Sequence, residues 1–426
     1  MLDIKFIRNN PDKVKEACKK KQVKVDIEKL LDIDKKRREV LQAIEGISAK
    51  KNEASDKIAK SKLDSEKKGI ILKMKELDKR NDRLDKSFKI LTKELDDLLF
   101  QIPNIPFDDV PVGKDDTENV AVKEVGQKPK FDFKFSDYLA LAENLDLIDI
   151  KRAAKVAGSR FSYLKNEAVQ IEFALVSFVF ENLIKEGFIP VLPPVMLKEE
   201  MARGTGYFES ADIKEAYFIP EDNLYLIGTS EQSLVAMHAD EILEEKDLPK
   251  RYLGFSTCFR RESGAYGKDT KGILRVHQFD KIEMVSFCHP EKSREEHEFL
   301  LSLEEKLMQA LNIPYQVVKI CTGDLGRPAA AKYDIEAWIP SENRYRETHS
   351  TSNCTDFQAR RLNIRFKRQE INNKKQLEFV HTLNGTAFAI GRTLIAIIEN
   401  YQQKDGSILI PGALQKYLPF KEIKPR

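Results

Sequence analysis

The stretch that decides the fold runs from Phe259 to Glu283 and reads FRRESGAYGKDTKGILRVHQFDKIE. Two alternating runs, 256–262 and 275–287, flank a polar loop with three glycines, which is typical of an antiparallel hairpin with a long connection. Side chains alternate between the two faces of a strand. One face of this hairpin is therefore expected to carry two arginines, two carboxylates and an aromatic ring, namely Arg260, Glu262, Arg275, Phe279 and Glu283.

Such a face carries more charge than a buried sheet tolerates unless a ligand neutralises it. A nucleotide would do so, because arginine binds phosphate, an aromatic ring stacks on a base and a carboxylate accepts an amine or a hydroxyl. A ladder of surface salt bridges is the alternative, although it leaves Phe279 without a role. Glu262 stands where a Walker loop needs its first glycine, and there is no GxGxxG motif, so we expect any ATP site to be built on an antiparallel sheet.

A second informative stretch, HTLNGTAFAIGRTLIAIIENYQ, covers residues 381–402. It predicts a strand through Asn384, Gly385 and Thr386 that leads into a helix beginning near Gly391. Packing beneath a sheet explains most of this helix. Arg392, at the junction between strand and helix, is better suited to binding a phosphate.

Three shorter patterns are weaker. GTSEQSL places Thr229 and Glu231 on one side of an extended segment, where they form either a helix cap or a ligand site. RETHSTSNCTDFQARR offers Glu347 and Ser350 as hard oxygen ligands for Mg²⁺. The six histidines lack metal spacing, so no zinc site is predicted, and a structural role is favoured for His277 although alternation places it on the face of Phe279.

The N-terminal quarter has a different character. Residues 26–100 contain 37 charged side chains, and no proline lies between Pro11 and Pro103. Apolar residues recur there in alternating steps of three and four, the pattern of a coiled coil, first over residues 33–58 and again over 70–98. Antiparallel pairing of Val40 with Leu91 and of Ile44 with Phe88 places the turn near 64–65. The predicted structure is a projecting helical hairpin about 40 Å long.

The predicted tip of this hairpin is basic. It is either a solvated helical face or a surface that grips a polyanion such as nucleic acid. Residues 50–80 contain eleven basic side chains against six acidic ones: Lys50, Lys51, Lys57, Lys60, Lys62, Lys67, Lys68, Lys73, Lys75, Lys79 and Arg80.

These patterns divide the chain into a helical arm (1–102), a linker rich in Pro and Asp (103–120) and a larger domain (121–426). Near its start the larger domain should contain a helix that ends at Gly187, followed by the short strand 188–192. The apolar stripe predicted for that helix consists of Val169, Phe173, Val176, Phe180 and Leu183.

Composition limits the class of protein. The 426 residues include 72 basic and 69 acidic side chains, a net charge of +3 that does not by itself predict a nucleic-acid partner. The five cysteines are too far apart for a zinc or disulfide framework, and no apolar stretch is long enough to span a membrane. Cytoplasmic location is the expectation.

Taken together, the motifs resemble those of class II aminoacyl-tRNA synthetases, in particular seryl-tRNA synthetases of the bacterial type. EGFIPVLPPVM (186–196) is similar to the first class II motif, the hairpin stretch to the second and NGTAFAIGRTLIAIIENYQ to the third. The TSE triplet, SNCTDFQARR and the N-terminal hairpin are similar to the seryl subgroup. The resemblance implies an α+β fold, an antiparallel-sheet class II catalytic domain preceded by an N-terminal antiparallel coiled-coil arm.

The resemblance also implies roles for individual residues. Arg260 holds the α-phosphate, Arg275 supports it and Arg392 reaches the γ-phosphate, and these three are the catalytic residues. The implied metal ligands are Glu347 and Ser350. The implied serine site consists of Thr229, Ser230, Glu231, Arg260, Glu283, Asn384 and Thr386. The implied ATP site consists of Arg260, Arg261, Glu262, Val276, Phe279, Glu347, Thr348, His349, Ser350 and Arg392.

The implied activity is that of a serine–tRNA ligase. With ATP and Mg²⁺ the serine carboxylate attacks the α-phosphorus to give seryl-adenylate, and the seryl group then passes to the 3′ end of tRNA(Ser), or of tRNA(Sec) where present. The arm would bind the long variable arm of the tRNA, and the first motif implies a homodimer. Two alternatives stay open, a ligase that loads a carrier protein and a coiled-coil scaffold with an inactive synthetase domain.

Overall fold

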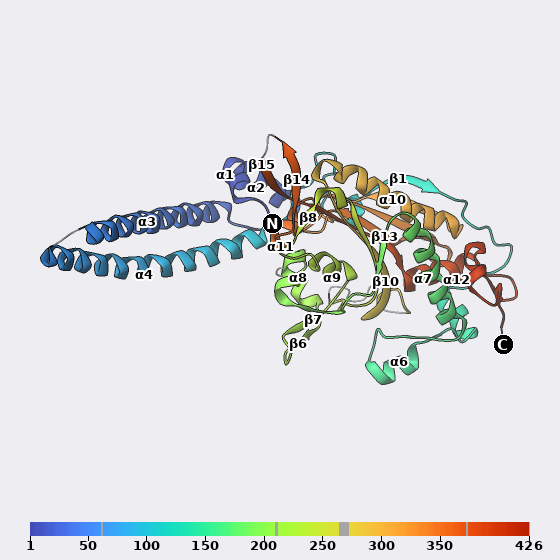
Figure 1. Cartoon of the computed structure of the whole chain (residues 1–426). Helices are drawn as coiled ribbons and strands as arrows, with labels where there is room; N and C mark the ends of the chain where they lie inside the picture. Colours follow the sequence, from blue (N-terminus) through green and yellow to red (C-terminus); the bar gives the residue numbers. More distant parts are fainter. Residues whose placement is uncertain (61–62, 209–211, 264–271, 372–373, 426) are drawn as a thin grey trace. The chain divides into compact units, whose positions relative to one another are not determined.

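The computed structural model describes residues 1–60, 63–208, 212–263, 272–371 and 374–425. The chain forms two compact units, Leu2–Pro103 and Asn104–Arg426, and each is described by itself (Figure 1). Long helices make up the first unit, and a mostly antiparallel sheet organises the second. The α+β class predicted from the sequence is therefore confirmed.

The N-terminal unit is helical throughout its regular structure. Its two long helices contact each other and form the predicted hairpin. Their sequences lack proline and repeat their apolar residues in steps of three and four, as the pairing of two helices requires. The four helices of this unit are α1 (Ile4–Asn9), α2 (Pro11–Lys20), α3 (Ile27–Lys60) and α4 (Asp64–Gln101).

The turn of this hairpin lies earlier than the sequence analysis placed it, because α4 already begins at Asp64. As a result Phe88 lies beside Arg37, whose guanidinium carbon is 5.6 Å from the ring centroid, instead of beside Ile44. Arg37 and Ile44 are one heptad apart. A heptad pattern matches itself after every seven residues, so it cannot distinguish registers that differ by one heptad, and the position of the turn decides.

An eight-stranded sheet forms the centre of the second unit. All neighbouring strands are antiparallel except β4 and β9, which are parallel. In spatial order the strands are β1 (Val120–Val125), β11 (Tyr315–Lys319), β12 (Ala331–Ile339), β13 (Arg344–Asn353), β16 (His381–Ala389), β10 (Gln278–Cys288), β9 (Lys250–Phe259) and β4 (Ile189–Val191).

Helices pack against both faces of this sheet. Leu253, Ile282 and Met284 face the main hydrophobic core, which includes residues of α5 (Tyr138–Asn144), α7 (Glu167–Lys185), α10 (Ser293–Ala310) and α12 (Ile390–Asn400). The opposite face carries Tyr252 and Val285 in a second core that includes residues of α9 (Ser230–Ala236) and α11 (Phe357–Leu362). The second face is where the candidate site is found, and we call it the site face.

The predicted apolar stripe of α7 is wrong in part. Phe173 is 60% exposed, whereas Ile171, Leu175 and Phe178 are buried in the main core. Apolar residues occur on almost every side of this helix, so a period of 3.6 does not single out one face. The predicted helix end and strand are present, with Gly187 at a φ of +88° between the end of α7 at Lys185 and the start of β4 at Ile189.

The remaining regular elements are short. The helices are α6 (Ile150–Ala157) and α8 (Glu199–Thr205). Single 3₁₀ turns cover Asp116–Glu118, Asp212–Glu215, Glu245–Asp247, Pro290–Lys292, Pro340–Glu342 and Gly412–Tyr417. The strands are β2 (Ile148–Asp149), β3 (Tyr163–Leu164), β5 (Met196–Lys198), β6 (Phe218–Ile219), β7 (Leu224–Leu226), β8 (Ile242–Glu244), β14 (Arg365–Ile371), β15 (Lys374–Phe379), β17 (Ile408–Leu409) and β18 (Glu422–Ile423).

The stretch that follows Pro103 packs on the second unit. The Asn104 side chain is buried and donates to the backbone oxygens of Pro328 and Cys354, each at 2.8 Å.

All five cysteines are buried and none forms a disulfide. Within the described ranges every helix is too short or too polar to cross a bilayer.

Asp34 provides a test of the N-terminal unit. Its side chain is fully buried, and its Oδ2 accepts from Arg38 Nε at 3.1 Å and lies 2.8 Å from Arg8 Nε. Asp34→Ala should lower the local free energy of unfolding by about 2 kcal/mol, less than for a fully buried pair because both arginines reach solvent. Hydrogen exchange of the α3 amides in the full chain measures this. The matched control Asp32→Ala removes an exposed pair with Lys36 and should change little, so equal losses of protection would contradict the prediction.

Candidate active site

The hairpin predicted from the second motif is formed by β9 and β10, in antiparallel register with Phe279 opposite Cys258. Both strands are shorter than expected towards the connecting loop. β9 ends at Phe259 and β10 begins at Gln278, so Arg260, Glu262 and Arg275 lie beyond the paired strands. Strand alternation therefore does not explain how these three come together. Residues 264–271 of the loop lie outside the described residues.

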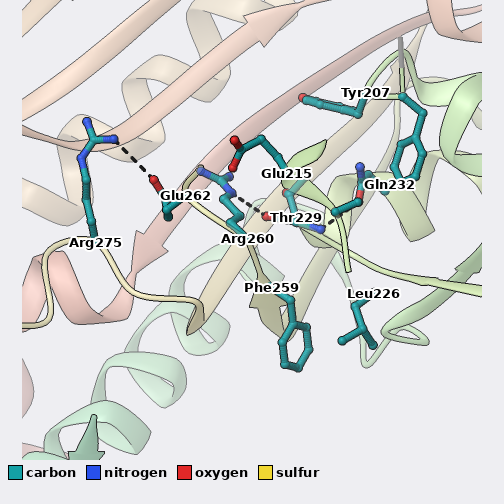
Figure 2. Close-up of a pocket in the computed structure, with 12 residues that line it drawn as sticks. Tyr207, Glu215, Leu226, Thr229, Gln232, Phe259, Arg260, Glu262 and Arg275 are labelled. Carbon is teal, nitrogen blue, oxygen red and sulfur yellow. Dashed lines mark hydrogen bonds and ion pairs between the residues drawn. The ribbon is translucent and has the colours of Figure 1, made fainter. Parts of the chain in front are cut away.

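Arg260, Glu262 and Arg275 nevertheless line a common cavity of about 430 Å³ (Figure 2). Arg275 Nη1 lies 3.4 Å from Glu262 Oε2, and Arg260 Nε donates to the backbone oxygen of Gly228 at 3.1 Å. The walls are Tyr207, Phe208, Glu215, Ala216, Leu226, Gly228, Thr229, Gln232, Phe259, Arg260, Glu262 and Arg275. We call this cavity the Arg260 pocket.

Phe279 lies on the site face beside this pocket. The guanidinium carbon of Arg260 is 5.2 Å from the centroid of the Phe279 ring. A planar base that stacks on Phe279 would therefore bring its phosphates within reach of Arg260. Val276 is buried just before β10 begins.

Arg261 is turned away from Arg260. Its Nε donates to the backbone oxygen of Ala216 at 2.9 Å, and its guanidinium carbon lies 4.5 Å from the centroid of the Tyr217 ring. In this arrangement Arg261 anchors the segment that forms one wall of the Arg260 pocket. A contact of its side chain with ATP stays a prediction.

The TSE triplet does not form the extended segment that the sequence analysis expected. Thr229 is the N-cap of α9, and its Oγ1 accepts from the Glu231 backbone N–H at 3.3 Å. The Ser230 hydroxyl is buried and donates to the backbone oxygen of Gly254 at 3.4 Å. A Cβ atom at Gly254 would lie 2.7 Å from Leu234, so the missing side chain lets α9 approach β9 closely.

Glu231 is buried at the start of α9 and is 1% exposed. Its carboxylate accepts from the Tyr207 hydroxyl at 2.6 Å and from Gln358 Nε2 at 2.8 Å. Burial, together with the nearby charge of Glu283, raises the pKa of Glu231 to about 7. This carboxyl group therefore titrates near neutral pH, which is common for groups that bind or exchange protons with a ligand.

The register of β10 with β16 places Glu283 opposite Thr386. Glu283 is fully buried, forms an ion pair with Lys281, and accepts from Asn384 Nδ2 at 3.1 Å and from Thr386 Oγ1 at 3.4 Å. Three of the predicted serine-binding residues therefore form one polar cluster on the site face. A buried cluster of this kind suits a small ligand that carries a hydroxyl and an ammonium group.

Arg392 and Glu347 meet at the far side of the site. Arg392 Nη1 donates to the backbone oxygen of Glu347 at 2.9 Å and lies 3.2 Å from its Oε2. Desolvation raises the pKa of Glu347, but the charges of Arg392 and Lys332 outweigh it and bring this pKa to about 2. The charge of Arg260 acts in the same direction. An ionised carboxylate is thus held beside the predicted phosphate-binding arginines.

Thr348 and His349, which follow Glu347, have buried side chains. Thr348 Oγ1 donates to the backbone oxygen of Ile335 at 3.1 Å, and the His349 ring lies 5.4 Å from the Phe388 ring between centroids. Burial lowers the pKa of His349 to about 3, which keeps the imidazole neutral. Both side chains pack in the protein interior. A contact of these two residues with ATP would therefore involve their backbone atoms, and it stays a prediction.

Ser350 lies opposite Asp334 in the register of β12 with β13. Asp334 is buried and lies 3.2 Å from Lys332 Nζ, and burial raises its pKa to about 7. Among the described residues no group of three or more His, Cys, Asp or Glu side chains could hold a metal by itself. The Glu347 carboxylate and the Ser350 hydroxyl still fit Mg²⁺, which commonly combines one or two protein oxygens with phosphate oxygens.

Some residues of the site escaped the sequence analysis. Strand alternation could have identified Lys281, because it lies between Phe279 and Glu283 on one face of β10. Tyr207, Gln358 and Asp334 could not be found in this way, since loops and strand pairing bring them in from distant parts of the chain.

The basic tip residues lie where α3 ends and α4 begins. Lys62 falls outside the described residues. The others are exposed or partly exposed, and Lys51 Nζ lies 2.5 Å from Asp78.

Two family descriptions match the chain. The seryl-tRNA synthetase N-terminal domain matches residues 1–106, and the tRNA synthetase class II core domain (G, H, P, S and T) matches residues 217–401. The second match contains the Arg260 pocket arginines, the Glu283 cluster and Arg392.

Proteins named serine–tRNA ligase from Dictyoglomus turgidum and Thermococcus sibiricus are 46% and 44% identical to this chain. The alignments cover all of this chain and 100% and 98% of those proteins. Because the relatives include bacterial and archaeal proteins, they do not distinguish a bacterial type.

Two solved structures are also similar over the whole chain. Seryl-tRNA synthetase from Pyrococcus horikoshii complexed with ATP is 43% identical, with a TM-score of 0.92 and full coverage of both chains. Cytoplasmic serine–tRNA ligase from Naegleria fowleri in complex with AMP is 33% identical, with a TM-score of 0.86 and coverage of 100% and 99%. With its site geometry, its two domain matches and these full-length likenesses, the chain belongs to the seryl-tRNA synthetases of class II.

Proposed function

We propose that this protein activates L-serine with ATP to form seryl-adenylate and pyrophosphate. The terminal ribose hydroxyl at the 3′ end of tRNA(Ser), and of tRNA(Sec) where that tRNA occurs, then takes the seryl group, and AMP is released. The observation that carries the proposal is the Glu283, Asn384 and Thr386 cluster on the same sheet face as Phe279, whose ring lies beside Arg260. This arrangement combines a site suited to recognising a small polar amino acid with a site suited to binding a nucleotide. The relative crystallised with ATP supports the choice of nucleotide.

In the first step Arg260 binds the α-phosphate, the Phe279 ring stacks on adenine, and Arg275 holds Glu262 beside them. The serine carboxylate attacks the α-phosphorus, and pyrophosphate leaves. No side-chain nucleophile is required, because the substrate carboxylate itself attacks. Catalysis rests on alignment and on fixed positive charge that stabilises the negative charge of the transition state.

Arg392 changes its partner in this proposal. In the structure it is paired with Glu347. We expect the γ-phosphate to take the place of that carboxylate and to leave Glu347 free. Glu347 and Ser350 would then hold Mg²⁺, which when bound supplies further positive charge to the phosphates.

In this proposal the Glu283 and Thr386 side chains form hydrogen bonds with the serine hydroxyl. The Glu231 carboxylate accepts a hydrogen bond from the serine ammonium group. Threonine differs from serine by one methyl group, so it must be rejected by lack of space. Alanine lacks the hydroxyl and would leave the buried Glu283 cluster without a partner.

The proposal assigns a different role to each domain. The proposed division is an arm (1–102), a linker (103–120) and a catalytic domain (121–426), and the basic tip of the arm binds the long variable arm of the tRNA. We keep the bacterial type and the cytoplasmic location as parts of this proposal. The acceptor end of the tRNA enters the catalytic domain.

A homodimer is also part of the proposal. β4 is an outer strand of the sheet, and one of its edges has no partner strand among the described residues. Large apolar side chains near it are exposed, which is typical of a surface that a second protein covers. They include Ile189 (48% exposed), Leu192 (76%) and Met196 (46%).

The central experiment is amino-acid-dependent exchange of pyrophosphate into ATP, measured with serine, threonine, alanine and glycine in parallel. We expect exchange with serine, and a specificity for serine over alanine of about 10⁴ because alanine leaves buried polar groups unpaired. Arg260→Ala should abolish exchange without loss of the fold. Comparable exchange with alanine, or exchange in Arg260→Ala within tenfold of the wild-type rate, would contradict the assignment.

Glu231 predicts a pH dependence. Its pKa is raised to about 7, so the carboxyl is neutral below that pH and charged above it. A neutral carboxyl cannot pair with the serine ammonium group, so the KM for serine should rise about tenfold from pH 8 to pH 6. The KM for ATP serves as the internal control. Glu231→Gln should give a high KM that no longer varies with pH, and an unchanged profile in that variant would refute the role of Glu231.

The arm gives a separate prediction. Deleting residues 30–100 should leave serine activation intact and abolish tRNA charging, because the second compact unit contains the Arg260 pocket and the Glu283 cluster. A milder variant, Lys67→Ala with Lys68→Ala at the tip, should raise the KM for tRNA and reduce its dependence on salt. The matched control is Lys13→Ala with Lys19→Ala in α2. If the deleted protein still charges tRNA normally, the arm does not bind it.

A further inference from the structure

The strand pairing that holds most residues of the sheet does not include the charged residues of the Arg260 pocket. Arg260 and Glu262 follow the last residue of β9, and Arg275 precedes the first residue of β10. These side chains are the proposed ATP contacts, and their backbone lies outside the strand ladder. Other contacts must hold them, since a displacement of about 1 Å is enough to impair catalysis.

Arg160 contacts both arms of the hairpin at this point. It comes from the loop between α6 and β3. Its Nη1 donates to the backbone oxygen of Glu262 at 2.8 Å, and its own backbone oxygen accepts from the His277 N–H at 2.9 Å. One residue thus links the segment after β9 to the segment before β10.

His277 completes the link. The Arg260 backbone N–H donates to the backbone oxygen of His277 at 3.0 Å, and His277 Nδ1 lies 3.0 Å from the backbone oxygen of Arg260. The imidazole also packs beside Phe161, with 5.3 Å between ring centroids. The loop that carries Arg160 therefore touches His277 from two adjacent residues.

The backbone shows why such a link is needed. Glu262 has a φ of +49° and Arg160 a φ of +60°, a left-handed conformation that side-chain-bearing residues seldom adopt without tertiary support. The conformation of Glu262 sets the direction of its carboxylate towards Arg275, as Figure 2 shows. If the guanidinium of Arg160 were lost, the Glu262 carbonyl would lose the contact that holds it.

We propose that Arg160 is a positioning residue for ATP binding, which acts through the backbone of Glu262 and through His277 on the geometry of Arg260 and Glu262. The inference rests on the proposed function, because it assigns ATP to the Arg260 pocket. The serine site should not depend on Arg160. Glu283 and Thr386 lie opposite each other within the paired parts of β10 and β16.

The test is a comparison of KM values in the exchange reaction. Arg160→Met keeps much of the apolar stem and removes the donor, and it should raise the KM for ATP about tenfold and lower kcat, with the KM for serine unchanged. Arg160→Lys retains a cationic donor and should recover part of the loss. His277→Phe keeps a ring beside Phe161 and removes the Nδ1 contact with the backbone oxygen of Arg260. It should likewise raise the KM for ATP and leave the KM for serine unchanged.

Arg152→Ala is the matched control. Arg152 lies in the same region, its side chain is 76% exposed, and it is paired with Asp149. This variant should retain both wild-type KM values. Thermal unfolding of every variant measures stability in parallel.

Two results would overturn the inference. One is equal loss of ATP and serine affinity in Arg160→Met together with a lowered unfolding temperature, which a merely structural role predicts. The other is an unchanged KM for ATP in both Arg160→Met and Arg160→Lys. Absence of serine-dependent exchange in the wild-type protein would instead refute the proposed function, so the two failures are distinguishable.

Discussion

The antiparallel pairing of β10 with β9 on one side and with β16 on the other is the constraint on which the rest of the structure depends. The first pairing places Phe279 beside Arg260, and the second places Glu283 opposite Thr386. Backbone hydrogen bonds fix both registers, so the nucleotide part and the amino-acid part of the site share one central strand. A slip of one residue would turn Phe279 and Glu283 to the opposite face.

Charge on this sheet face is tolerated because most of it is paired. Glu283 has Lys281, Glu262 has Arg275, and Arg392 has Glu347. Of these three pairs, Glu283 with Lys281 is buried, whereas the other two reach solvent, and neither kind of pair contributes much net stability. Their value here is that they keep cations and carboxylates in fixed positions before a ligand arrives, which lowers the reorganisation that binding requires. Glu231 differs, because its hydrogen-bond partners Tyr207 and Gln358 are neutral. Burial and the charge of Glu283 raise its pKa to about 7, although these two hydrogen bonds act in the opposite direction.

Much of the fold and the site could be predicted from local sequence. The heptad pattern predicted the helical hairpin, and alternation placed Phe279 and Glu283 on one face of a strand. Prediction failed where a pattern was equally consistent with several arrangements. The heptad repeat left the register of α3 and α4 open by one heptad, and α7 carries apolar residues on nearly every side. The extended segment predicted for Thr229 and Glu231 was wrong, but Thr229 does form a helix cap, one of the two roles left open for it, at the start of α9.

The sequence by itself determined the residue types at the site, the strand that carries Phe279 and Glu283, and the family, because these depend on the order of residues along short segments. Only the tertiary structure decided how Arg260, Glu262 and Arg275 are held. They lie beyond the strand ends, where alternation no longer applies, and Arg160 and His277 contact the backbone of Glu262 and Arg260. Arg160 and Glu262 are 102 positions apart in the chain, and Arg260 and His277 are 17 positions apart. No periodicity in the sequence records these contacts, since they depend on how loops pack once the sheet has formed.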